Sequence, residues 1–203
     1  FVPTMGSIHK GHEFLIQKCK KECKKTIISI FINPTQFDNK KDLKNYPKNV
    51  KKDLSILKKL KVDFVFIPKV DDIYAIKRKK KIKLNKKNLV LCAKYRKGHF
   101  EGVMDVMDRL TKLICPSKIF MGEKDFQQYL LVKKFLEYKY KTKIIMCSTI
   151  RSTNKLALSS RNLLLNKENF LKAGRIIREL IKFKKEILRT NKINKNLIYK
   201  KKD

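Results

Sequence analysis

The sequence has no tryptophan, and it holds only three histidines and six glycines among its 203 residues. Its five cysteines form no CxxC pair and are odd in number, which argues against a disulfide framework and against a zinc site. No apolar run reaches the ~18 residues of a membrane-spanning helix, and no charged and then apolar leader is present. We therefore expect a reduced, cytoplasmic protein without a membrane segment.

Acidic residues are scarce as well, because 18 Asp and Glu stand against 52 Lys and Arg and give a formal net charge of +34. Such an imbalance suggests a nucleic acid or an anionic membrane as partner. The lysines, however, are spread through nearly every segment and form no single stripe with interleaved aromatic residues. We interpret the charge as a solvated basic surface from an AT-biased genome. We expect salt-sensitive attraction to polyanions and no specific nucleic-acid partner.

Short apolar runs rich in β-branched and aromatic residues predict buried strands. These runs cover 26–32, 62–68, 118–122 and 143–147, and the end of another strand is expected at 1–3. Apolar residues recur at helical spacing within 14–19, 50–60 and 103–114. Strands that alternate with helices predict an α/β fold, a Rossmann-like parallel sheet with helices on both faces. Ligands of such sheets bind beyond the carboxyl ends of the strands.

The domain organisation follows from composition. Residues 75–88 form a basic low-complexity stretch, which we interpret as an insertion or edge loop. From 167 onward, apolar residues at helical spacing predict a helix that runs into a polar tail. We predict a catalytic domain over residues 1–165 and the start of a smaller carboxyl-terminal domain with a basic tail over residues 166–203. Because the chain begins with Phe1 and the first motif follows at once, we also expect that this sequence lacks an upstream strand or helix, either naturally or by truncation.

Polar clusters follow four of the predicted strands, and together they predict a site at one edge of the sheet. In sequence order they read TMGSIHKGH, NPTQF, EKDFQQ and STIRSTNKLALSSRN. In the first, Gly6 lets the chain turn tightly, and the following helix start offers N–H groups to a phosphate. His9 and His12 share one side of that helix and can donate to an oxyanion that gains charge during phosphoryl or adenylyl transfer. Capping or surface histidines are the alternative interpretation.

Two further clusters carry phosphate-type residues. Ser159 and Ser160 can bind phosphate oxygens, and Arg161 offers a fork of donors that suits a triphosphate. Lys124 in GEKD adds another cation of this kind. A solvated turn or helix N-cap is the alternative for the first group, and an ordinary charged helix start for the second. The sequence has neither a GxxxxGK[ST] loop nor a GxGxxG loop, which disfavours those routes of nucleotide binding.

Five motifs in a fixed order, HxGH, NPTQF, RKGHFEGV, GEKDFQQ and LALSSRN, give the chain a close resemblance to the pantothenate synthetases, the pantoate–β-alanine ligases. That family belongs to the HIGH-type nucleotidyltransferase superfamily, and the resemblance extends from Phe1 to about Asn162. It implies a two-step reaction in which pantoate and ATP give pantoyl adenylate and pyrophosphate, and β-alanine then gives pantothenate and AMP. It implies ATP as a substrate with Mg²⁺, no metal site built from protein ligands, and a homodimer as the assembly to test.

The resemblance also carries roles over to individual residues. It assigns the catalytic role to His12, the family's proton donor, together with His9 and Lys124. It assigns ATP binding to Met5, Gly6, Ser7, Ile8, His9, Lys10, Gly11 and His12, to Gly122, Glu123, Lys124 and Asp125, to the backbone of Ile150, and to Leu158, Ser159, Ser160 and Arg161. It assigns contacts with pantoate or β-alanine to Gln36, Gln128, Asn33, Arg96 and His99.

Some positions depart from the family pattern. Lys97 stands where the family usually has proline, and Asn154 and Lys155 stand where it usually has aspartate and glycine. The family's smaller carboxyl-terminal domain, which helps cover the site and contributes to the usual dimer, should follow SSRN, and we expect it to be largely absent.

The alternatives left by the sequence are another HxGH nucleotidyltransferase, such as a cytidylyl or phosphopantetheine adenylyl transferase, a decayed relative of low activity, and a basic nucleic-acid-binding protein. The first is not expected to combine NPTQF with GEKDFQQ, and only the net charge favours the last.

Overall fold

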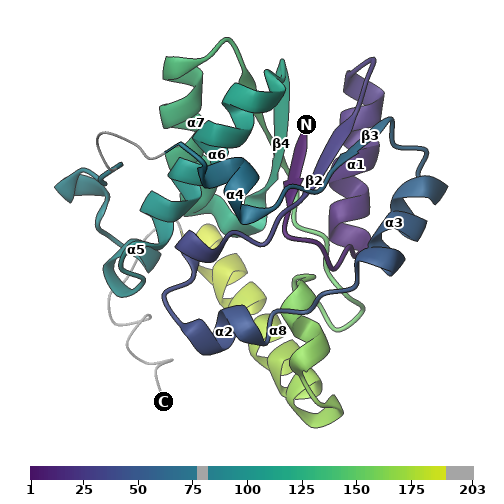
Figure 1. Ribbon diagram of the computed structural model, residues 1–203. Helices are drawn as coiled ribbons and strands as arrows, with labels where there is room; N and C mark the ends of the chain where they lie inside the picture. The colour runs from purple at the N-terminus through teal and green to yellow at the C-terminus, as the bar shows by residue number, and fades with distance from the viewer. Residues whose placement is uncertain (77–81, 191–203) are drawn as a thin grey trace.

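The computed structural model describes residues 1–76 and 82–190 (Figure 1). Part of the basic stretch predicted at 75–88, and the whole tail predicted after the last helix, lie outside the described residues. None of the helices in the described ranges combines the length and the apolar character that crossing a membrane requires.

Among the described residues, five parallel strands form the centre of the fold, and they confirm the predicted α/β arrangement. They are β1 (Val2–Thr4), β2 (Ile27–Ile30), β3 (Phe64–Phe66), β4 (Lys118–Gly122) and β5 (Lys143–Cys147). β1, β2 and β3 pair in this order, and β4 pairs with β5. The backbone N–H of Phe120 donates to the carbonyl of Phe1 at 2.9 Å, so β1 and β4 lie side by side. The strands therefore follow the order β3, β2, β1, β4, β5.

Helices cover both faces of these strands, as Figure 1 shows for α1 and α3 on one side and α6 and α7 on the other. The helices are α1 (Lys10–Glu22), α2 (Lys40–Lys44), α3 (Val50–Lys59), α4 (Val70–Tyr74), α5 (Cys92–Tyr95), α6 (His99–Ile114), α7 (Phe126–Lys139) and α8 (Lys167–Thr190). Ile16 of α1 and Leu57 of α3 pack with Ile28 and Phe120 in one buried cluster. Val106 and the other apolar residues of α6 pack with α7 in a second cluster on the opposite face. Burial on both faces explains the apolar residues of β1, β2 and β4, whereas β3, at the end of the strand order, has no buried residue and its Phe64 is 56% exposed.

The helices predicted at 14–19, 50–60, 103–114 and from 167 onward are confirmed by α1, α3, α6 and α8, whereas α7 was not predicted. The apolar residues of α7 lie on more than one side of the helix: Tyr129, Val132 and Leu136 are buried, while Phe126 and Tyr138 are exposed. Such a helix has no clear apolar stripe, and its sequence gives little helical periodicity. The helices α2, α4 and α5 have five residues or fewer, which is too short for periodicity to reveal.

Candidate active site

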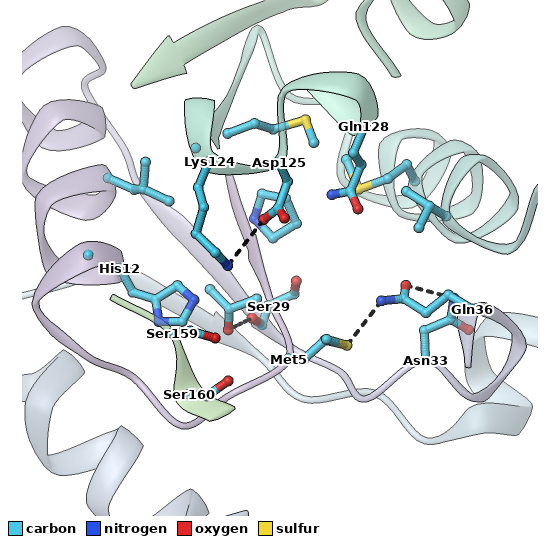
Figure 2. Close-up of a pocket in the computed structure, with 18 of the residues that line it drawn as sticks. Met5, His12, Ser29, Asn33, Gln36, Lys124, Asp125, Gln128, Ser159 and Ser160 are labelled. Atoms are coloured by element: carbon cyan, nitrogen blue, oxygen red, sulfur yellow. Dashed lines mark hydrogen bonds and ion pairs between the residues drawn. The ribbon is translucent and has the colours of Figure 1, made fainter. Parts of the chain in front are cut away.

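The carboxyl ends of β1, β2, β4 and β5 open on a cavity of about 270 Å³, at the edge where the sequence predicts a site (Figure 2). The predicted site residues that line it are Met5, His9, Gly11, His12, Asn33, Gln36, Arg96, His99, Gly122, Lys124, Asp125, Gln128, Ile150, Leu158, Ser159, Ser160 and Arg161. The predicted residues outside its lining are Gly6, Ser7, Ile8, Lys10 and Glu123. Gly6 and Ser7 instead line a second hollow of about 240 Å³, on the α3 side of the turn.

The turn after β1 is held by a buried carboxylate. Gly6 and Ser7 have φ angles of 79° and 52°, so the chain passes through the left-handed region at two successive residues. Asp53 of α3 accepts the backbone N–H of Ser7 at 2.8 Å and that of Ile8 at 2.7 Å. A Cβ on Gly6 would lie 2.9 Å from Asp53 Oδ2, which adds a steric reason for glycine there. The sequence pattern did not predict this role of Asp53. The one signal for it was a carboxylate four residues before Leu57, on the buried face of α3.

His9 and His12 begin α1 and cap it as well as line the cavity. His9 is the N-cap residue, and its Nδ1 accepts the N–H of Gly11 at 3.1 Å. His12 Nδ1 in turn accepts the backbone N–H of His9 at 3.4 Å. Since each Nδ1 is an acceptor, the proton of each neutral ring belongs on Nε2. The capping interpretation and the cavity interpretation therefore both hold.

Burial keeps both rings uncharged at neutral pH. It lowers the pKa of His12 to about 3, with further contributions from the neighbouring His9 and Lys124. Burial and then Lys124 also lower the pKa of His9. His12 is accordingly a neutral hydrogen-bond donor and not an imidazolium. The positive charge of this group comes from Lys124, whose Nζ lies 3.7 Å from the carboxylate of Asp125 (Figure 2).

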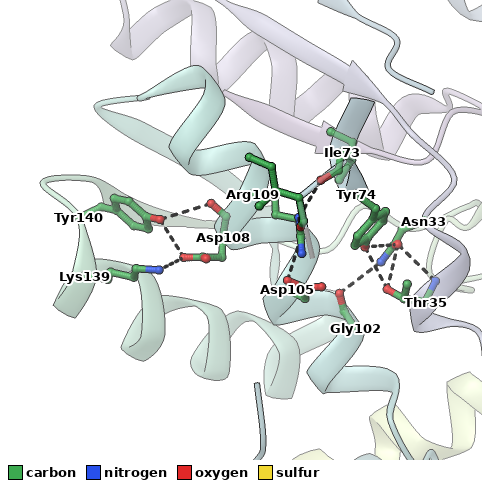
Figure 3. A network of polar contacts seen from close by, with 11 residues as sticks. Asn33, Thr35, Ile73, Tyr74, Gly102, Asp105, Asp108, Arg109, Lys139 and Tyr140 are labelled. Carbon is green, nitrogen blue, oxygen red and sulfur yellow. Dashed lines mark hydrogen bonds and ion pairs between the residues drawn. The ribbon is translucent and has the colours of Figure 1, made fainter. Parts of the chain in front are cut away.

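Asn33, which follows β2, forms side-chain hydrogen bonds with other residues of the protein. Its side-chain oxygen accepts the hydroxyl of Tyr74 at 2.7 Å and that of Thr35 at 3.0 Å, and its amide nitrogen donates to the carbonyl of Gly102 at 3.2 Å (Figure 3). The same nitrogen lies 3.1 Å from Oε1 of Gln36. With an exposed fraction of 1%, Asn33 is placed to orient Gln36 and to fasten this loop to α6.

A second chain of hydrogen bonds reaches the same loop from the start of α6. His99 Nδ1 donates to the carbonyl of Gln36 at 2.7 Å, because only a ring N–H can satisfy a carbonyl oxygen. The other ring nitrogen of His99 then accepts from Arg96 Nη1 at 3.1 Å. Burial lowers the pKa of His99, which agrees with a neutral ring. The side-chain amide of Gln36 points to the sulfur of Met5 at 3.2 Å (Figure 2), so the loops after β1 and β2 meet at this point.

The sequence was also compared with models of known protein families. A family model described as Pantoate-beta-alanine ligase matches residues 1–202. The chain belongs to the pantoate-beta-alanine ligase family.

Alignments with individual relatives show how much of a relative's length this chain covers. The chain is 42% identical over 170 residues to a pantothenate synthetase of Helicobacter acinonychis (strain Sheeba), an alignment that covers 82% of this chain and 62% of the relative. It is 38% identical over 188 residues to a pantothenate synthetase of Thermosipho africanus (strain TCF52B), covering 92% of this chain and 68% of the relative. It therefore spans less than two thirds of the first relative's length.

A solved structure of a pantoate-beta-alanine ligase also matches the fold of this chain. The crystal structure of the pantoate-beta-alanine ligase from Francisella tularensis, complexed with beta-gamma ATP and beta-alanine, superimposes with a TM-score of 0.83 at 41% identity. The match covers 87% of this chain and 68% of that protein.

The loop that departs from the usual pantoate-beta-alanine ligase sequence keeps a glycine-like backbone. Lys155 has a φ of 72°, in the left-handed region that glycine adopts readily. Its carbonyl accepts Nη1 of Arg151 at 3.0 Å, and its N–H donates to the carbonyl of Ser152 at 2.9 Å. Asn154 donates from Nδ2 to the carbonyl of Phe170 in α8 at 2.9 Å. The two substitutions are thus accommodated without loss of the turn.

No group of three or more His, Cys, Asp and Glu side chains among residues 1–76 and 82–190 is arranged to hold a metal ion. Asp125 carries the only carboxylate among the described residues that line the cavity. Ser29 contributes a buried hydroxyl to the wall, and its Oγ has no hydrogen-bond partner in the described part of the chain.

Proposed function

We propose that this chain activates pantoate with ATP and joins the pantoyl group to β-alanine, giving pantothenate, AMP and pyrophosphate. The observation that carries the proposal is the convergence on one cavity of neutral histidine donors, a lysine, a pair of serines and two glutamines. The family to which the chain belongs, and the beta-gamma ATP and beta-alanine bound to the Francisella tularensis relative, support the same chemistry.

The two ends of the cavity suit the two substrates. His12, Lys124 and Ser159 gather on one side in Figure 2, and Gln36 and Gln128 lie on the other. Hydrogen-bond donors and a cation suit phosphate oxygens, whereas amide side chains can both donate to and accept from the hydroxyls and carboxylate of pantoate. We therefore place the triphosphate beside α1 and pantoate beside the loop after β2, with the α-phosphorus between them.

In the first step, a pantoate carboxylate oxygen attacks the α-phosphorus, the bond from that phosphorus to the bridging oxygen breaks, and pyrophosphate leaves. Negative charge grows on the leaving oxygens and on the α-phosphoryl group. His9 and His12 donate from Nε2 toward this charge, and Lys124 adds a positive charge. Because these groups are fixed before the reaction, they stabilise the transition state without reorganising.

In the second step, the uncharged amine of β-alanine attacks the acyl carbon of pantoyl adenylate. The bond from that carbon to the adenylate oxygen breaks, AMP leaves, and the new amide loses one proton to solvent. The chain holds the two reactants in position here, and no covalent bond to the protein is required.

Magnesium accompanies the nucleotide in this proposal as part of the substrate, the Mg²⁺ complex of ATP. Asp125, the one carboxylate among the described residues of the cavity lining, could contact such an ion, and the phosphate oxygens would supply its other ligands. We also propose that the reaction takes place in the cytoplasm, and the family's homodimer remains the assembly to test.

The proposal is tested by exchange of labelled pyrophosphate into ATP without β-alanine, which isolates the first step. We expect exchange that depends on pantoate and Mg²⁺ and that the His12→Ala variant nearly abolishes. Addition of β-alanine should then release one AMP for each pantothenate. Pantoate-independent exchange, or exchange no greater than that of His12→Ala, would contradict the proposed function.

A further inference from the structure

The serine and arginine segment that lines the cavity is tied to α2, far away in sequence. Arg161 donates from Nε to Asp42 Oδ1 at 3.0 Å and from Nη2 to Asp42 Oδ2 at 2.7 Å, so the pair is bidentate. Close by, the hydroxyls of Tyr46 and Ser160 lie 2.9 Å apart. Two separate connections therefore join residues 160–161 to the segment that includes α2.

Aromatic rings hold the same guanidinium from another direction. Its carbon lies 5.1 Å from the ring centre of Tyr46 and 6.0 Å from that of Phe37. These two rings meet edge to face, with centres 5.8 Å apart. A planar cation held along one edge by a carboxylate and approached by two rings has little freedom to rotate.

One side of the guanidinium is left for a ligand. Asp42 engages Nε and Nη2, and Nη1 of Arg161 has no hydrogen-bond partner among residues 1–76 and 82–190. Arg161 lines the cavity, whereas Asp42 does not. Arg161 also lowers the pKa of Asp42, so this carboxylate stays ionised at neutral pH. Asp42 therefore has no direct contact with a nucleotide bound in the cavity, whereas Arg161 can have one.

We infer that Asp42 is a positioning residue, which fixes Arg161 so that its remaining amino group meets a phosphate oxygen of ATP. The inference rests on the proposed function, because it assigns the arginine to the triphosphate. A carboxylate close to phosphates repels them, so Asp42 helps only if the orientation it imposes outweighs that repulsion. The opposite role, in which Asp42 competes with ATP for the arginine, predicts the opposite sign.

The experiment measures pantoate-dependent pyrophosphate exchange and, separately, binding of a non-hydrolysable ATP analogue by calorimetry. We expect Asp42→Asn to lower kcat/KM for ATP by about 10- to 100-fold, since small misplacements of a substrate-positioning group have effects of this size. Asp42→Glu should recover part of the loss. In an Arg161→Gln background, Asp42→Asn should change kcat/KM by less than about twofold, because the two residues act as one unit.

The matched control is Glu22→Gln. Glu22 forms a salt bridge of 3.0 Å with Lys118, and its side chain is about as exposed as that of Asp42. Glu22 is not among the residues that line the cavity. We expect it to leave both measurements unchanged. Urea midpoints of all variants show whether a loss reflects unfolding.

The outcomes separate the inference from the proposed function. Wild-type protein without pantoate-dependent exchange would contradict the function, and the analogue affinities of the same variants would still test the role of Asp42. Active wild-type protein with an unaffected Asp42→Asn variant would overturn the inference alone. Tighter analogue binding by Asp42→Asn, or a full effect of Asp42→Asn in the Arg161→Gln background, would overturn it as well.

Discussion

The imidazole rings of His9 and His12 lie with their centres 4.0 Å apart and their planes tilted by 31°. Two protonated rings at this distance would repel each other strongly, and burial adds a further cost to charging either one. Hydrogen bonds from the backbone to both Nδ1 atoms remove the remaining choice of tautomer. The pair therefore presents two Nε2–H donors, with Lys124 as the nearby cation.

The pKa of His12 makes the stability of the fold depend on pH. An unfolded histidine takes up its proton near pH 6.5, whereas the folded ring does so near pH 3. Between these values the unfolded state binds more protons, so the free energy of unfolding falls as the pH is lowered, and the full contribution is present above pH 6.5. From pH 7 to pH 5 we expect a loss of about 2 kcal/mol that depends on His12.

Urea unfolding of wild type and His12→Gln at both pH values measures this loss. Gln carries no titrating group, so the variant should lose about 2 kcal/mol less than wild type on acidification. Equal losses in the two proteins would show that His12 titrates normally in the folded state.

Asp53 supplies a second prediction, because it is 2% exposed and accepts two backbone N–H groups of the turn after β1. Asp53→Asn leaves one oxygen for these two donors and turns an NH₂ group toward one of them. We expect the free energy of unfolding to fall by about 1–3 kcal/mol, the cost of a buried unsatisfied group. The exposed Asp71 offers a control, and Asp71→Asn should have little effect in the same urea titration. Equal midpoints for the two variants would rule out this role for Asp53.

The contact of α6 with the loop after β2 depends on Gly102. A Cβ there would clash with the carbonyl oxygen of Thr35 and would lie 2.9 Å from the backbone nitrogen of Gln36. Alanine is the better helix former, so helix propensity alone predicts that Gly102→Ala stabilises the protein. We expect the opposite, a loss of about 1–3 kcal/mol, because the clash involves backbone atoms that cannot rotate away.

The measurement compares Gly102→Ala with Lys112→Ala, a change at an exposed position of the same helix. Since Gln36 moves with its loop, the KM for pantoate in the exchange reaction should rise more than the KM for ATP. A more stable Gly102→Ala variant would contradict the close approach.

Lys155 gives a prediction with a built-in control. Its φ of 72° is costly for any residue with a Cβ and costs glycine little. Lys155→Gly should raise the free energy of unfolding by about 0.5–1 kcal/mol, whereas Lys155→Ala, which keeps the Cβ, should not. Equal effects of the two variants in thermal or urea unfolding would assign the change to the lysine side chain and not to the backbone.

Much of the architecture could be predicted because the strands are short apolar runs and polar residues follow them directly. The sheet, its two covered faces and the edge that carries the site follow from that pattern. α7 could not be predicted, since its apolar residues point in all directions.

The contacts that support the site could not be predicted for a different reason: they join residues that are far apart in the sequence. Asp53 meets Ser7 across 46 positions, and Arg161 meets Asp42 across 119. A pattern along the chain shows which side chains share a helix face or a strand end, but it does not show which distant acceptor will meet a given N–H group. Asn33 illustrates the limit, because its place after a strand puts it at the predicted edge of the sheet but does not show that it will bond to Tyr74 and Gly102.

The most direct test of the account measures how His12→Ala divides its effect between binding and rate. A neutral donor aimed at charge that develops only in the transition state should lower kcat of pantoate-dependent pyrophosphate exchange by about 100- to 1000-fold. The dissociation constant for ATP, measured by calorimetry, should change by less than about threefold. An equal loss in ATP affinity and in rate would contradict the account and make His12 a simple phosphate-binding residue.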